Sequence, residues 1–319
     1  MLYNMQMLNK FIATSSQPLI VILGPTGSGK TDFSIRLARA LEKEGKKPEI
    51  VSADSRQLYR FLDIGTAKIR NEEMYGIPHH LFSVLDPREE VTVAWYREKA
   101  LAMIDEILAR GSCPILVGGS MLYLSAIIDG LELLPSADPA VRSRLEEEYE
   151  KDRGISLHLR LQEVDSESAV SIHPNNKPYI IRAMEIYESS GGIPSQEKKK
   201  SHCPYNLFIV GTHWSREALV RMINERTERL LRSGWIAEVQ SLLQRGYSVD
   251  DPGMNSLGYR EIGEGLRRGL GEAEIVKQYG EVIAAKTRQY AKRQMTWWKN
   301  DERIRWVNYE GSTHAISNS

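Results

Sequence analysis

Residues 24–31 read GPTGSGKT, and their types and spacing are those of a loop that binds a diphosphate or triphosphate. The pattern is G-x-x-x-x-G-K-[ST], with its fixed positions at Gly24, Gly29, Lys30 and Thr31. Glycine lets the backbone wrap so that successive N–H groups point at phosphate oxygens. Lys30 would reach the terminal phosphate, and the Thr31 hydroxyl would ligate Mg²⁺. The motif predicts a phosphate cradle but not the reaction, because many chemistries share this loop.

Two further side chains have the chemistry to act beside such a cradle. Asp54 directly follows an apolar run, where it could ligate Mg²⁺ through water or accept a proton from a nucleophile. The alternative is a turn acid or helix N-cap, since Asp-Ser is common in turns. Ser120 follows Gly118 and Gly119, and its default interpretation is also a helix N-cap. An N-cap beside a phosphate site can contact the ligand as well, so the two roles of Ser120 are compatible.

The elements that must position these groups alternate between strand and helix. Short apolar runs predict buried strands at residues 19–23, 49–53, 114–117 and 207–211. Helical patterns follow the P-loop and cover residues 94–110 and 121–129. This alternation predicts an α/β fold, a P-loop NTPase-like core with a parallel sheet flanked by helices. Ligands of such sheets bind beyond the carboxyl ends of the strands, where the P-loop, Asp54 and Ser120 all fall, so we expect a single site.

The character of the chain changes in the middle. Strand–helix alternation stops between about 132 and 205, where a strongly charged helical pattern begins at Asp138-Pro139 and a Lys198–Lys200 run closes the segment. We therefore expect a helical insertion domain over 132–205. The core then comprises 18–131 and 206–319, mostly helical from about 215 to 300, and residues 1–17 are expected to be a flexible leader.

Composition narrows the class of protein. The chain has 319 residues and 42 basic against 42 acidic side chains, so a nucleic-acid binder would have to concentrate its positive charge locally. The two cysteines have no metal-ligand spacing and indicate a reduced, cytoplasmic protein. No apolar run approaches the length of a membrane span, and we expect no membrane association. His79 and His80 are adjacent and lack further ligands, which argues against a metal site there.

Positive charge does gather near the C-terminus. Residues 286–300 contain no acidic residue, and their basic residues are Lys286, Arg288, Lys292, Arg293 and Lys299. Tyr290, Trp297 and Trp298 interleave with them. A solvated helix face is the ordinary explanation of such a run, but the aromatic interleaving favours contacts with nucleic-acid phosphates.

Motifs spread along nearly the whole chain resemble those of the tRNA dimethylallyltransferases (tRNA isopentenyltransferases). Besides GPTGSGKT, they read SADSRQLYRFLDIGTAK (52–68), GIPHHL (76–81), VGGSMLYL (117–124), DPAVRSR (138–144), HPNNKPYIIRAMEIYESSG (173–191), NSLGYREI (255–262) and TRQYAKRQMTWW (287–298). The family more often has Thr where this chain has Ser120, and the hydroxyl is kept. The zinc-finger tail of eukaryotic relatives is absent, which indicates the bacterial form.

The resemblance implies transfer of a dimethylallyl group from dimethylallyl diphosphate to N6 of the adenine immediately 3′ of the anticodon. Diphosphate, the leaving group, would be bound with Mg²⁺ on Thr31 by Gly24, Pro25, Thr26, Gly27, Ser28, Gly29, Lys30 and Thr31. Asp54 would take the N6 proton, while Lys30, Ser120 and Arg226 support the reacting centre. The residues implied for tRNA are Asp54, Ser55, Arg56, Gln57, Ser120, Arg142, Pro178, Tyr179, Ile180, Ile181 and Arg182, to which the basic run adds Arg288 and Lys292.

Three alternatives remain open at this point. An adenylate isopentenyltransferase would prenylate a free nucleotide, but it needs neither the insertion nor the basic run. A nucleotide or nucleoside kinase would use the same cradle for phosphoryl transfer. A non-catalytic RNA-binding P-loop protein would need neither Asp54 nor Ser120 at strand ends. We expect a monomer whose partners are the tRNA anticodon stem-loop and dimethylallyl diphosphate.

Overall fold

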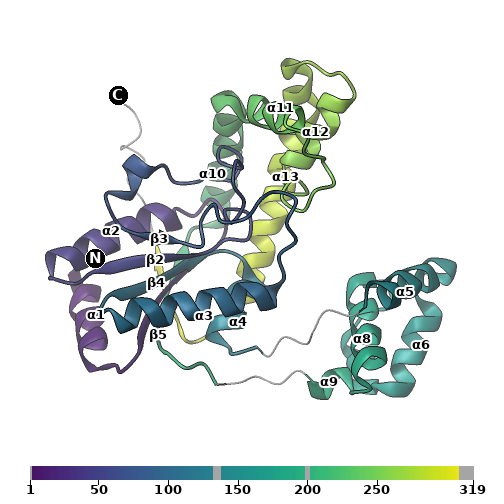
Figure 1. The fold of residues 1–319 in the computed structure, drawn as a ribbon, viewed down its shortest axis with the longest axis horizontal. Coiled ribbons are helices and arrows are strands. Elements are labelled where there is room, and N and C mark those ends of the chain that lie inside the picture. The colour runs from purple at the N-terminus through teal and green to yellow at the C-terminus, as the bar shows by residue number, and fades with distance from the viewer. Residues whose placement is uncertain (1, 132–137, 198–201, 309–319) are drawn as a thin grey trace. The chain divides into compact units, whose positions relative to one another are not determined.

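A single parallel sheet forms the centre of the fold. The computed structural model describes residues 2–131, 138–197 and 202–308 (Figure 1). Its six strands run in the order β3-β2-β4-β1-β5-β6, and all neighbours are parallel. Their bounds are β1 Pro18–Leu23, β2 Pro48–Ala53, β3 His79–His80, β4 Cys113–Gly118, β5 Asn206–His213 and β6 Ile304–Asn308. The four strands predicted from apolar runs are confirmed as β1, β2, β4 and β5, whereas β3 and β6 were not predicted.

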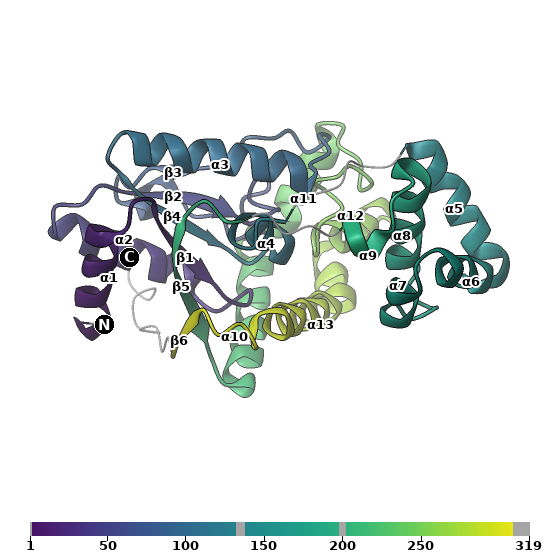
Figure 2. The ribbon, with the colours of Figure 1, turned by 90° about the horizontal axis from the view of Figure 1, so that it is seen from below.

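Helices cover both faces of this sheet (Figure 2). Successive residues of a strand point to opposite faces, so β1 supplies both cores. Leu19 and Val21 pack in one core with α3 (Val93–Ala109) and α4 (Met121–Ile128). Ile20 and Ile22 pack in the other, which includes buried side chains of α1 (Leu2–Thr14) and α2 (Lys30–Lys43).

The expected flexible leader is wrong, because residues 2–14 form helix α1. Leu8 is buried against the sheet, and the ring of Phe11 lies 5.4 Å from that of Phe208. The sequence signal is the i, i+3, i+6, i+7 spacing of Met5, Leu8, Phe11 and Ile12, in which each residue lies three or four from another, and this gives one apolar helix face. Packing of that face removes apolar surface from water, and this burial stabilises the helix.

The C-terminal half supplies the helices that reach the carboxyl ends of the strands. They are α10 Arg216–Leu230, α11 Ile236–Gln244, α12 Tyr259–Arg267 and α13 Glu272–Trp298. A π-helical turn at Leu231–Trp235 separates α10 from α11, and Gly234 within it has φ 98°. Helices α10 and α13 lie side by side (Figure 1).

The chain divides into two compact units, residues 1–128 with 203–319, and residues 129–202. The second unit contains α5 Pro139–Asp152, α6 Ile155–Val164, α7 Ser166–Ser171, α8 Lys177–Ser190 and α9 Pro194–Glu197. It has an apolar core of its own. Both ends of the insertion expected over 132–205 involve stretches outside the described residues, at 132–137 and 198–201, and the Lys198–Lys200 run is among them. Among the described helices, none is long and apolar enough to cross a membrane.

A buried carboxylate near the start of β2, that of Glu49, contacts Arg110 and His80. Glu49 accepts hydrogen bonds from Arg110 Nε (2.9 Å) and Nη2 (2.6 Å), and its Oε2 lies 2.7 Å from His80 Nε2. These contacts, chiefly those of Arg110, lower the pKa of the Glu49 carboxyl to about 2. The ordinary pKa of Glu is about 4.3. The ionised carboxylate therefore contributes stability that is complete well above pH 4.3 and is lost as the pH falls toward 2.

We expect Glu49→Gln to lower the free energy of unfolding at pH 7 by about 2 kcal/mol, because it leaves Arg110 without its charged partner. Urea denaturation of the two proteins between pH 7 and about pH 2.5, which spans most of the window between the unfolded and folded pKa of Glu49, followed by circular dichroism, measures the difference. The difference in the free energy of unfolding should narrow as the pH falls, because only wild type has a carboxylate at residue 49 whose contribution to stability is lost. A difference that is the same at every pH would mean that the charge of Glu49 does not stabilise the fold.

Candidate functional site

A cavity of about 290 Å³ lies at the carboxyl ends of the central strands. The loop after β1 contributes Thr26, the loop after β2 contributes Asp54, and Gly119 follows β4. Helix α2 adds Lys30 and helix α10 adds Arg226. The prediction that the P-loop and Asp54 share one site is confirmed, because parallel strands bring their carboxyl ends to one edge. Ser120 itself does not line the cavity but lies directly beside it, after Gly119.

Contacts within the P-loop and with β5 fix the conformation of the loop. Gly29 has φ 80°, a left-handed conformation that favours glycine, and it directly precedes α2. Lys30 Nζ spans the loop and donates to the Pro25 carbonyl at 2.8 Å. The hydroxyls of Ser28 and Thr212 are 2.6 Å apart. This arrangement places the lysine ammonium at the mouth of the loop, beside the N-terminus of α2.

Two partly buried cations face one carboxylate across the cavity. Burial lowers the pKa of Lys30 to about 8; the negative charge of Asp54 opposes this shift, and Arg226 adds to it. Burial also lowers the pKa of Arg226, again with Asp54 acting in the opposite direction. Arg226 Nη1 donates to the Thr26 hydroxyl at 3.2 Å, so the guanidinium reaches the P-loop. The excess positive charge in a desolvated space suits a polyanionic ligand.

Asp54 is oriented by the turn that follows it. Its Oδ1 accepts from the backbone N–H of Arg56 (2.9 Å) and of Gln57 (3.4 Å). This is the turn acid that the sequence left as an alternative. No described residue donates a hydrogen bond to Oδ2, while the residue lines the cavity. One oxygen therefore fixes the carboxylate and the other is available to a reacting group.

Known proteins resemble this chain in sequence and in fold over most of its length. The profile of a family described as "IPP transferase" matches residues 57–301. A tRNA dimethylallyltransferase of Geobacter sulfurreducens is 40% identical, with 96% of each chain covered. One of Symbiobacterium thermophilum is 42% identical, covering 92% of this chain and 90% of the relative. The chain belongs to the IPP transferase family.

Solved structures agree with that assignment. The tRNA isopentenylpyrophosphate transferase of Bacillus halodurans is 37% identical, with a TM-score of 0.65 and coverage of 92% of this chain and 90% of that one. A eukaryotic dimethylallyltransferase acting on tRNA is 25% identical, with a TM-score of 0.74 and coverage of 92% and 74%. The P-loop-like α/β core predicted from the sequence is thus the fold of this family.

Gln294 is a site residue that the sequence analysis missed. Its Oε1 accepts from the Thr26 backbone N–H at 2.7 Å, and its Nε2 donates to the Gly119 carbonyl at 2.6 Å. The side chain is buried, and it joins the loops that follow β1 and β4. One turn earlier on α13, Tyr290 also lines the cavity, where burial and the charge of Asp54 raise its pKa to about 12. The available signal was that these two residues are four apart on one helix face.

The Ser120 hydroxyl accepts a hydrogen bond from the Ser55 backbone N–H at 2.9 Å, and Ser120 is buried. It therefore ties the Asp54 turn to the end of β4.

We expect Ser120→Ala to slow turnover about five- to tenfold, which corresponds to loss of one hydrogen bond of about 1 kcal/mol. Ser120→Thr keeps the hydroxyl and should retain near wild-type turnover. Measured kcat values that are the same for Ala and Thr would show that the hydroxyl has no role.

The residues expected to bind tRNA fall in both units. Asp54, Ser55 and Arg56 line the cavity, Gln57 and Ser120 are next to lining residues, and Lys292 is exposed on α13. Arg288 is more constrained: it donates to Asn224 and to Glu281, each at 2.6 Å.

In the second unit, Arg142 and Arg182 both donate to the buried carboxylate of Glu185, at 3.1 and 3.2 Å. Both arginines are therefore salt-bridged, and both guanidinium groups remain partly exposed. Ile180 and Ile181 are a correction: their side chains are buried in the core of this unit and cannot contact tRNA. Within Pro178–Arg182, the exposed neighbours are Pro178 and Tyr179.

Proposed function

We propose that this protein transfers the dimethylallyl group of dimethylallyl diphosphate to N6 of the adenine immediately 3′ of the tRNA anticodon. The observation that carries the proposal is the polarity of the cavity. Its lining combines the charged side chains of Lys30, Arg226 and Asp54 with apolar ones, Ile223, Leu230, Trp235, Leu257 and Ile283 among them. A donor with a charged diphosphate and a five-carbon apolar tail matches both kinds of lining.

The reaction is a substitution at the carbon that carries the diphosphate. The N6 amine attacks that carbon, the C–O bond breaks with its electron pair leaving on diphosphate, and Asp54 Oδ2 takes the N6 proton. Charge grows on the leaving oxygen as the bond breaks. Lys30, Arg226 and the P-loop N–H groups would stabilise that charge.

Magnesium would join the site through the substrate. The described residues contain no cluster of three His, Cys, Asp or Glu side chains that could hold a metal ion alone. Mg²⁺ does not need such a cluster, because it is commonly held by few protein oxygens together with substrate phosphates. We assign the Thr31 hydroxyl as its protein ligand. When bound, the ion would neutralise charge on the diphosphate.

The acceptor adenine has to leave its stack to reach Asp54, as in other enzymes that modify bases. We assign Arg56 and Gln57, beside the cavity, and Arg142, Pro178, Tyr179 and Arg182 in the second unit to contacts with the anticodon stem-loop. Such a substrate places the protein in the cytoplasm.

Labelled dimethylallyl diphosphate, offered with an anticodon stem-loop or with free AMP, tests the choice of acceptor. We expect label in the stem-loop and none in AMP. A matched stem-loop with guanine in place of the adenine 3′ of the anticodon should stay unlabelled. Label in AMP alone would identify an adenylate isopentenyltransferase, and label in neither would refute prenyl transfer.

Salt dependence tests the basic stretch of α13. Each phosphate contact that is lost lowers the slope of log K against log salt by about 0.9. We expect Lys292→Ala with Lys299→Ala, both exposed in wild type, to lower the slope for tRNA binding by about two units. Adding Arg288→Ala should lower the slope further but by less than a full unit, because Glu281 already pairs with Arg288.

The control changes Lys43 and Lys47 to Ala. Both are exposed; Lys43 is the last residue of α2 and Lys47 follows it, at the end of the helix opposite the P-loop. An unchanged slope in the folded α13 variants, equal to that of the control, would make the basic stretch a solvated face and leave tRNA binding to other residues.

A further inference from the structure

The segment that follows Asp54 returns to the cavity at Gly65 and Thr66. Non-glycine residues in the left-handed region lie on either side of that point, Phe61 with φ 69° and Ala67 with φ 48°. Such conformations cost about 1–3 kcal/mol each and persist where surrounding contacts fix them. This segment therefore needs external contacts to keep its shape.

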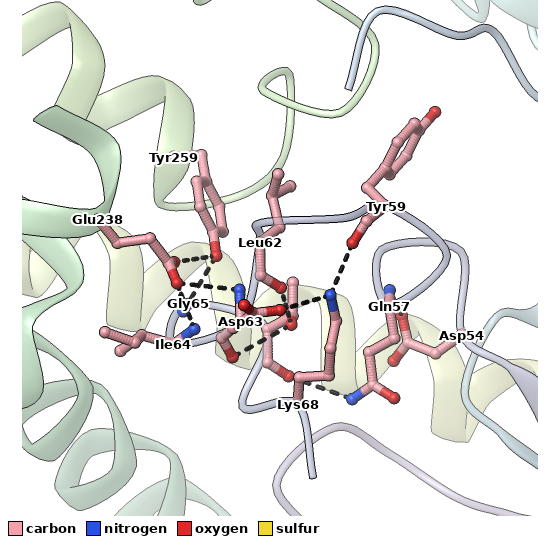
Figure 3. Close-up of polar contacts among 11 residues, drawn as sticks. Asp54, Gln57, Tyr59, Leu62, Asp63, Ile64, Gly65, Lys68, Glu238 and Tyr259 are labelled. Atoms are coloured by element: carbon pink, nitrogen blue, oxygen red, sulfur yellow. Dashed lines mark hydrogen bonds and ion pairs between the residues drawn. The ribbon is translucent and has the colours of Figure 1, made fainter. Parts of the chain in front are cut away.

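Glu238 on α11 supplies them. Its Oε2 accepts from the backbone N–H groups of Asp63 (3.0 Å) and Ile64 (2.7 Å), and its Oε1 accepts from that of Gly65 (3.3 Å). Three successive N–H groups that converge on one carboxylate form the kind of nest that binds an anion. On the opposite side, Lys68 Nζ donates to the Asp63 carboxylate at 2.7 Å. The segment is thus held from two directions (Figure 3).

Tyr259 completes the contact. Its hydroxyl donates to Glu238 Oε1 at 2.5 Å and accepts from Gly65 N–H at 3.1 Å. The tyrosine is buried, and its ring meets that of Trp235 edge-on at 5.6 Å. A Cβ on Gly65 would lie 2.0 Å from Trp235 Nε1 and 2.5 Å from the Tyr259 ring, so only glycine fits here. Both side chains therefore fix the backbone position of Gly65 closely.

The fixed backbone leads directly to the reacting centre. The next carbonyl, that of Thr66, accepts from Arg226 Nη2 (3.4 Å) and from Gln57 Nε2 (3.3 Å). Arg226 contacts the Thr26 hydroxyl through its other terminal nitrogen. Glu238 also lies beyond the π-helical turn on the same helical segment as Arg226. A displacement of Gly65 would thus be passed to the Arg226 guanidinium through a single carbonyl.

We propose that Glu238, assisted by Tyr259, is a positioning residue that aims Arg226 at the diphosphate by fixing the backbone of residues 63–66. The proposal rests on the proposed function. Glu238 does not line the cavity and contacts no reacting group; it acts through Arg226.

A double-mutant cycle tests this coupling. We expect Glu238→Gln to lower kcat about 30-fold, as misplacement of a group by about 1 Å commonly does, with a smaller change in KM for tRNA. Tyr259→Phe should have the same effect to a lesser degree, about fivefold. In an Arg226→Ala background, Glu238→Gln should change kcat less than threefold, because the group it positions is gone.

Binding of inorganic pyrophosphate, measured by calorimetry, separates failure of this proposal from failure of the proposed function. Glu238→Gln should weaken it in wild type but not in Arg226→Ala, whether or not the protein prenylates tRNA. Gln240→Ala, an exposed change on the same helix, serves as the control and should match wild type, and thermal unfolding shows that each variant is folded. Equal effects of Glu238→Gln in both backgrounds, or no effect in a folded variant, would overturn the proposal.

Discussion

Replacing Asp54 with Asn is expected to lower kcat about a thousandfold, within the range of about 10²–10⁴ that a general base contributes. Asn keeps an oxygen that can accept from the Arg56 N–H, so the turn should persist. What is lost is the second oxygen as a proton acceptor. Single-turnover transfer from dimethylallyl diphosphate to a saturating stem-loop measures the effect on chemistry, and tRNA affinity is expected to stay within about twofold.

A second consequence follows from the charges around Asp54. Its carboxylate raises the pKa of Lys30, against the lowering caused by burial. Pyrophosphate binding should weaken at alkaline pH, where Lys30 loses its proton. Asp54→Asn lowers the pKa of Lys30 and should therefore move this weakening to a lower pH. If tRNA affinity collapses while bound tRNA is turned over at the normal rate, Asp54 is a binding residue and not the base.

Replacing Lys30 with Met is expected to reduce kcat by about 10²–10³-fold, comparable to removing one preorganised donor from a developing anion. The ammonium has its greatest effect as diphosphate departs, so kcat should fall more than KM for the donor rises. In wild type, pyrophosphate affinity should decline as the pH rises through about 8, the pKa of Lys30. The Lys30→Met variant should lack that alkaline limb.

The same pKa predicts the effect on stability. The ordinary Lys pKa is about 10.4, and in the fold it is lowered to about 8. Folding therefore disfavours the charged form; the cost is fully present below pH 8 and disappears as the pH rises past 10.4. Lys30→Met should consequently be at least as stable as wild type at pH 7 by thermal unfolding. A destabilised variant with normal turnover would assign Lys30 a structural role.

Local sequence signals were sufficient for the part of the fold that carries the cradle. β1, β2, β4 and β5 are buried on both faces over most of their length and therefore contain short apolar runs, although β2 also includes Glu49 and Ser52. β6 is an edge strand in which only Ile304 is buried, and β3 has two residues, so neither has such a run. Helix α1 was missed because its apolar face was read as part of a loose leader.

The candidate site also has residues that local sequence signals predict and residues that they do not. The P-loop and Asp54 could be predicted because each lies in a local motif at a strand end. Gln294 could not, since its hydrogen bond to Thr26 joins residues 268 apart in sequence, and the Glu238 contact with Gly65 spans 173. Ile180 and Ile181 show the opposite error: a family stretch was transferred whole, although helical periodicity turns these two side chains into the core.

The central claim is that the P-loop binds a leaving group and not a phosphoryl group in transit. Dimethylallyl diphosphate labelled with ¹⁴C in the alkyl group and ³²P in the diphosphate, incubated with an anticodon stem-loop, tests it directly. We predict that the carbon label enters the RNA while all phosphorus label is released as diphosphate. Phosphorus label in the RNA, without carbon label, would contradict the account and indicate phosphoryl transfer from the same cradle.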